Sequence, residues 1–77
     1  MIIPLTEFIE LNPQIMIGKA VIKGTRITVE NIMEMIATGD TVDNIMEAFP
    51  HLSKEQILAA LRYATDVLKN EEIHPIK

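Results

Sequence analysis

Cysteine and tryptophan are both absent from this chain of 77 residues. Without cysteine, a disulfide scaffold and a thiolate zinc site are excluded. No apolar run approaches the length of about 18 residues that a membrane helix needs, and no signal peptide pattern is present. We therefore expect a soluble cytoplasmic protein.

Catalytic groups are scarce as well. The chain has two histidines, and it lacks a glycine-rich phosphate loop and paired carboxylates at a recognisable spacing. His51 stands between a proline and a leucine and is expected to lie in a loop. We expect neither an enzyme nor a protein with a metal, a cofactor or a small-molecule substrate.

Aromatic residues are few, with two Phe and one Tyr, although 48% of the residues are hydrophobic. The core must therefore be mostly aliphatic. A chain of this size buries only about 60% of its unfolded surface on folding, so its core is marginal. We expect support from a partner, most simply a homodimer.

Basic residues are the minority, with seven Lys and Arg against eleven Asp and Glu, and the net charge is -4. This balance argues against a uniform attraction to nucleic acid. Any DNA binding needs a local cluster of positive charge. Lys19, Lys23 and Arg26 form such a cluster, because no acidic residue occurs between Asn12 and Val29.

Residues 1–27 are predicted to form a β arm, because β-branched residues are dense there. Residues 8–11 are a strand candidate that ends at the turn-forming pair Asn12-Pro13. Gly18-Lys19 then separates two apolar runs, and glycine at the first central position suits a two-residue type II′ hairpin turn.

This hairpin would pair Ile17 with Ala20 and Ile15 with Ile22. Its second face would also be apolar, with Met16 opposite Val21. Since a two-stranded hairpin is barely stable alone, we expect one face to cover the helices and the other to cover a second copy of the chain.

Residues 28–70 are predicted to form three helices. Thr28 is placed as the N-cap of the first, and Gly39 as its C-terminal stop. Thr41 is placed to cap a second, shorter helix that ends at Pro50.

Ser53 and Gln56 form a capping-box pattern for the third helix, which is expected to end near Asn70. Tyr63 is predicted to lie outside its apolar stripe. The stripe is expected to consist of Ile57, Leu58, Leu61, Ala64, Thr65 and Leu68.

Three short-linked helices are typical of a tri-helical helix-turn-helix unit, whose last helix places its N-terminal residues in the major groove. The exposed face of that helix also carries acidic residues that offset its basic ones, so plain helix packing without DNA binding is the alternative. The candidate DNA-binding residues on this helix are Ser53, Lys54, Gln56 and Arg62.

The segment around Arg26 is a corner between a strand and a helix start. Gly24 permits a turn, and the Thr25 hydroxyl can bond to its own backbone. Arg26 is then either a phosphate contact or a brace that donates to backbone carbonyls. A cation is unfavourable beside a helix N-terminus, and a bound anion would suit both groups. The candidate contacts here are Lys19, Lys23, Thr25 and Arg26.

The run over residues 17–64 resembles a small prokaryotic family catalogued as domain of unknown function 433. The marks are the glycine-lysine turn, the segment VIKGTRI and the segment FPHLSKEQILAALRYA. The family usually has Gly-Gly-Lys-Pro at the turn, where this chain has Ile17 and Ala20 at the flanking positions.

The length of the chain indicates a single domain over residues 1–77. The resemblance implies that its helical part is a homeodomain-like helix-turn-helix. It further implies a VapB-type antitoxin of a type II toxin-antitoxin pair, which binds its own promoter and neutralises a PIN-like ribonuclease toxin. The alternative is a protein-interaction module that binds a partner without contacting DNA.

Residues 71–77 are expected to leave the third helix and run extended, because Pro75 disfavours a helical His74. A frayed terminus is one alternative. The resemblance implies another, in which this tail orders on the toxin. The partner-binding candidates are Glu71, Glu72, Ile73 and Ile76.

Overall fold

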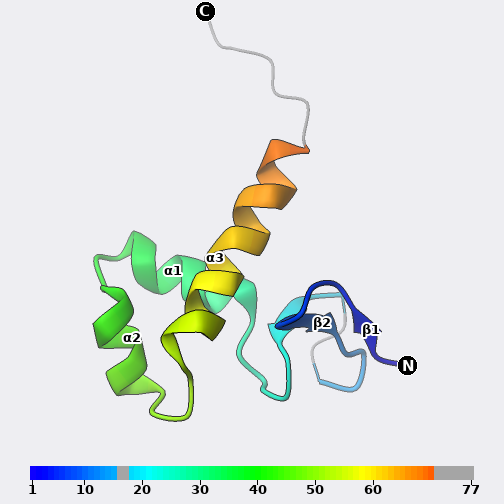
Figure 1. The fold of residues 1–77 in the computed structure, drawn as a ribbon, viewed down its shortest axis with the longest axis horizontal. Coiled ribbons are helices and arrows are strands. Elements are labelled where there is room, and N and C mark those ends of the chain that lie inside the picture. Colours follow the sequence, from blue (N-terminus) through cyan, green and yellow to red (C-terminus); the bar gives the residue numbers. More distant parts are fainter. Residues whose placement is uncertain (16–17, 71–77) are drawn as a thin grey trace, which may run out of the picture.

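The computed structural model describes residues 1–15 and 18–70. A small antiparallel sheet is followed by three helices (Figure 1). This arrangement confirms the prediction of a mainly helical fold with a short β arm at the N-terminus. The elements are β1 Ile3–Pro4, β2 Ile9–Leu11, β3 Ala20–Ile22, α1 Val29–Ala37, α2 Val42–Ala48 and α3 Lys54–Lys69.

The sheet has the order β1-β2-β3, and its register differs from the predicted hairpin. Ile22 of β3 pairs with Ile9 of β2, so the predicted pairing of Ile22 with Ile15 is wrong. Ile15 instead belongs to a turn, where its N–H donates to the Asn12 carbonyl at 3.0 Å. Pairing with Ile9 buries both isoleucines completely, which explains why this register is preferred.

The predicted second apolar face of the hairpin is also wrong as far as it is described. Val21 lies opposite Glu10 and is fully buried. The chain itself covers the outer edge of β3, because Val21 bridges to Thr28 and the Ile22 N–H donates to the Ile27 carbonyl at 2.9 Å. The sheet therefore leaves no apolar face at Val21 for a second copy. The predicted partners Met16 and Ile17 lie outside the described residues.

The predicted caps of the first two helices are confirmed. The Thr28 hydroxyl accepts from the Asn31 N–H at 3.0 Å, and the Thr41 hydroxyl accepts from the Asn44 N–H at 3.1 Å. Gly39 follows the end of α1 with a φ of 106°, the left-handed conformation that glycine adopts most easily.

The capping box of α3 is confirmed in both directions. The Gln56 N–H donates to the Ser53 hydroxyl at 3.2 Å, and the Ser53 N–H donates to the Gln56 side-chain oxygen at 2.7 Å. The helix ends at Lys69 with Asn70 as its C-cap, as predicted.

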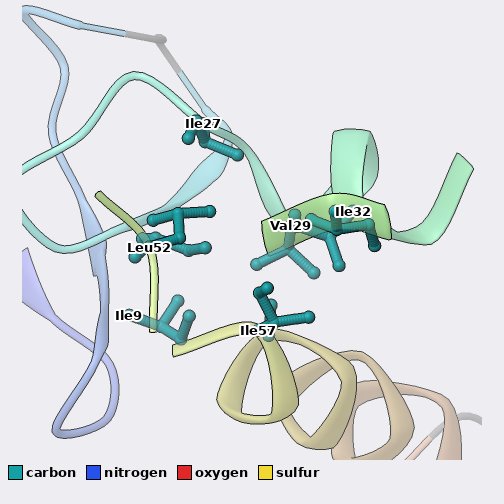
Figure 2. Packing of buried hydrophobic residues seen from close by; sticks show 9 residues of the cluster. Ile9, Ile27, Val29, Ile32, Leu52 and Ile57 are labelled. Atoms are coloured by element: carbon teal, nitrogen blue, oxygen red, sulfur yellow. The ribbon is translucent and has the colours of Figure 1, made fainter. Parts of the chain in front are cut away.

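The core lies between the sheet and the helices, where buried side chains from β2, β3 and all three helices meet (Figure 2). Its largest fully buried side chains are those of Ile9, Ile22, Ile32, Ile45 and Ile57, all with no exposed surface. Every buried hydrophobic residue of the described part is aliphatic, as predicted.

The face that α3 turns to the core differs from the predicted stripe. Ile57 and Ala60 are fully buried, whereas Leu58 is 45% exposed. One residue along a helix turns the side chain by about 100°, which carries Leu58 out of the line of Ile57, Ala60 and Ala64. Tyr63, predicted to lie outside, packs against the buried cluster.

Candidate nucleic-acid interface

The corner between β3 and α1 is held by bonds within its own turn. The Thr25 hydroxyl donates to the Ile22 carbonyl at 2.8 Å and accepts from the Ile27 N–H at 3.0 Å. Gly24 has a φ of 77°, and a Cβ there would meet no other atom within 4 Å. Glycine is therefore favoured by the backbone conformation and not by lack of space. Thr25 acts as a brace of the turn, with its hydroxyl already used twice.

Arg26 and Lys23 project from this corner into solvent, since both residues are exposed. The hydrogen bonds and the ion pair formed among residues 1–15 and 18–70 do not involve the Arg26 guanidinium. The alternative of a brace to backbone carbonyls thus has no bond to support it. Both cations remain available to a ligand.

The start of α3 presents two exposed side chains of opposite charge, Lys54 and Glu55, beside two polar side chains that are already engaged. Ser53 and Gln56 complete the capping box with each other. Lys54 is exposed and is the first residue of the helix. Ser53 and Gln56 therefore fix where the helix begins, and Lys54 supplies the positive charge.

The fold places the corner and the start of α3 on one side of the molecule. Ile27, which follows Arg26, and Leu52, which precedes Ser53, belong to the same buried cluster. In Figure 2 both side chains lie at the left of the cluster, on the same side as Ile9. Arg26 and Lys54, far apart in the sequence, therefore lie on segments that are anchored in the same buried cluster.

Lys19 differs from Lys23, Arg26 and Lys54 because it forms an ion pair. Its ammonium group contacts the carboxylate of Glu30 on α1, and both side chains are partly exposed. The basic cluster was predicted because no acidic residue occurs between Asn12 and Val29. Glu30, one position further on, lay outside that window. This neighbour weakens the case for Lys19 as a phosphate contact.

Arg62 lies on another surface, a groove of about 360 Å³ between α3 and the loop before β2. Three carboxylates share that groove with it, those of Glu7, Glu55 and Asp66. Their negative charge opposes the approach of a phosphate. Arg62 thus shares its groove with three carboxylates, whereas Lys54 has one of them, Glu55, as its neighbour in the first turn of α3.

Glu10 is a residue of this region that the sequence patterns did not single out. It is 6% exposed, and its carboxylate accepts from the Gly24 N–H at 3.4 Å. The carboxylate is therefore bonded to the backbone of the corner that carries Lys23 and Arg26. The signal in the sequence was a single acidic residue inside an otherwise apolar strand.

The predicted partner-binding residues, Glu71, Glu72, Ile73 and Ile76, lie outside the described residues. Among the residues that are described, no group of three or more histidine or acidic side chains is placed to hold a metal ion. None of the helices in the same part of the chain is long and apolar enough to cross a membrane.

Comparison with known proteins gives a family and one relative. The family described as "Protein of unknown function (DUF433)" matches residues 9–64. The "Uncharacterized protein y4eO" of Sinorhizobium fredii (strain NBRC 101917 / NGR234) is 36% identical over 58 residues, which cover 75% of this chain and 26% of that protein. No solved structure matches the chain significantly.

Proposed function

The chain belongs to the DUF433 family, and on that premise we propose that it is an antitoxin-like DNA-binding regulator of a type II toxin-antitoxin pair. It binds its own promoter through a homeodomain-like helix-turn-helix and neutralises a PIN-like ribonuclease toxin. In this proposal α2 and α3 form the motif, and α3 is the helix that enters the major groove.

The observation that carries DNA binding is that two exposed cations, neither of them in an ion pair among the described residues, lie on segments anchored in the same buried cluster. Arg26 directly precedes Ile27 and Lys54 follows Leu52 by two residues, and Ile27 and Leu52 belong to one buried cluster. In the proposal the Arg26 guanidinium and the Lys54 ammonium group each contact a phosphate of the DNA backbone, and the dipole of α3 favours an anion near Lys54, although Glu55 of the first turn offsets part of that attraction. Lys23 adds a third exposed cation at the same corner.

The proposal assigns different tasks to the remaining candidates. Thr25, Ser53 and Gln56 hold the turn and the helix start through their own hydrogen bonds. Lys19 and Arg62 are minor contributors, because Glu30 pairs with the first and three carboxylates surround the second.

The test measures binding of the whole chain to a DNA duplex of its own promoter over a range of salt concentrations. Arg26→Ala and Lys54→Ala should each weaken binding and reduce the salt slope by about 0.9, the contribution of one neutralised phosphate. Arg62→Ala is the matched control and should change the slope little. Unchanged affinity in both test variants would show that these residues are not the DNA contacts.

A second candidate is a protein-interaction module that never contacts DNA. It is favoured by the net charge of -4 and by the carboxylates around Arg62. This candidate predicts that the chain protects cells from the toxin of the neighbouring reading frame while failing to bind the promoter duplex.

Toxin neutralisation is proposed to depend on residues 71–77. A chain lacking these residues should still bind promoter DNA but should no longer restore the growth of cells that express the toxin. Continued growth of those cells would refute the role of the tail and leave the DNA-binding proposal intact.

A further inference from the structure

A second surface of the molecule lies away from the corner, in a groove of about 630 Å³ between α1 and the second half of α3. Its lining is mostly apolar, and the α1 edge carries two carboxylates, those of Glu30 and Glu34. The apolar lining comes from Ala20, Val29, Met33, Ala64, Val67 and Leu68.

The wall of this groove is the continuation of the core-facing stripe of α3. Ile57 and Ala60 are fully buried, and Ala64 packs against the same cluster. Val67 and Leu68 follow at the same helical spacing, yet they are 42% and 52% exposed. Figure 1 shows the last turns of α3 extending beyond α1 and the sheet. Within the described part of the chain, the apolar stripe thus runs past the elements that cover it.

We infer that a second copy of this chain covers the groove in a two-fold symmetric dimer. Each copy places Val67 and Leu68 in the groove of the other. A two-fold contact requires a surface that is complementary to itself, and here Val67 and Leu68 are exposed at the end of α3 and also line the groove. The dimer expected from the size of the chain is therefore built by α1 and α3 and not by the hairpin.

The charges at the edges of the groove also fit a second copy. On the α1 edge Glu30 is paired with Lys19, which lines the same groove, so the negative charge left there is that of Glu34, and the last turn of α3 ends in Lys69. When the end of α3 from one copy crosses the groove of the other, Lys69 approaches Glu34, whose carboxylate forms no ion pair among the described residues. Unlike charges brought together in this way favour the symmetric pairing.

The dimer does not depend on DNA binding, so it is tested on the free protein. Sedimentation equilibrium of the full chain at micromolar concentration should give about twice the chain mass of 8.7 kDa. Leu68→Glu should raise the dimer Kd at least tenfold, because it would place a charge in an apolar interface. The variant should keep the helical circular dichroism of the parent, since the Leu68 side chain is exposed in the isolated chain.

The matched control is Leu58→Glu, which introduces the same charge on α3 at a position of similar exposure, 45%, but outside the groove. It should leave the dimer Kd unchanged. A monomeric parent chain, a dimer that survives Leu68→Glu, or an equal loss in both variants would overturn the inference.

A charge exchange tests the orientation of the copies. Glu34→Lys and Lys69→Glu should each weaken the dimer, and the double variant should restore it toward the parent Kd. Failure of the double variant to recover would overturn the symmetric placement. If Leu68→Glu abolished toxin binding while the parent chain alone was a monomer, the groove would belong to the toxin and the inference would be wrong.

Discussion

Along α3, one apolar stripe meets two environments. In the first half of the helix, Ile57 and Ala60 are fully buried among side chains from the sheet and the other helices. In the second half, Val67 and Leu68 continue the stripe with about half of their surface exposed. The comparison shows that an apolar residue at helical spacing marks the direction of a face, whereas its burial depends on what lies opposite.

The lengths of the helices explain the difference. The helix α1 has 9 residues and α3 has 16, which correspond to about 13 Å and about 24 Å at 1.5 Å per residue. Since α1 is the main helical neighbour of α3, the longer helix extends past its cover. The first half of α3 therefore supports the fold, and the second half is available for an interaction.

The largest expected effect comes from truncating one aliphatic side chain in each half of α3 and comparing the losses of stability. Ile57→Ala should lower the free energy of unfolding by about 2 to 5 kcal/mol, because it opens a cavity in the core. Leu68→Ala should cost less than about 1 kcal/mol, since much of the side chain is exposed already.

Urea denaturation followed by circular dichroism measures both values, at a protein concentration low enough to keep the chain monomeric. Equal costs at the two positions would mean that the second half of α3 is as well covered as the first.

A smaller effect compares two hydroxyl groups on the same helix. Ser53→Ala removes the cap of the first turn and should destabilise the fold by about 1 kcal/mol. The Thr65 hydroxyl only donates to the Leu61 carbonyl, at 2.9 Å within the helix. Thr65→Ala should be neutral or slightly stabilising, because alanine has the higher helix propensity. Thermal unfolding of the two variants shows whether stability is lost because the helix cap is removed or because any hydroxyl on this helix is removed.

The smallest effect concerns the charged edge that faces the second half of α3. Glu30→Gln removes the ion pair with Lys19, and both side chains are largely exposed. The loss of stability should be below about 1 kcal/mol and should disappear near 1 M salt. Glu34→Gln is the control that lacks this ion pair. A loss that persists at high salt would show that packing, and not charge, is affected.

The helices could be predicted closely because their signals are local. A capping side chain such as Thr28 or Ser53 bonds to a backbone N–H only three residues away. A short window of sequence is therefore enough to predict the cap. Gly39 marks the end of α1 for a similar reason, since its positive φ disfavours other residues.

The sheet register could not be predicted in this way. Gly18-Lys19 suits a tight turn, but β3 pairs with β2, whose residues lie about ten positions earlier in the chain. The choice depends on which pairing buries Ile9 and Ile22 against the helices. The free energy of this burial arises only when the whole core is assembled, so no short segment of the sequence reveals it.

The candidate site divides in the same manner. The sequence by itself determined which residues carry positive charge, where each helix begins, and that the turn at Gly24 and Thr25 closes locally. Only the tertiary structure decided that the segments of Arg26 and Lys54 are anchored in one buried cluster, that Glu30 pairs with Lys19, and that Glu7 joins the acidic residues of α3 in the groove of Arg62. The physical reason is that capping and turn formation act over a few residues, whereas charge pairing and burial depend on distances that folding alone creates.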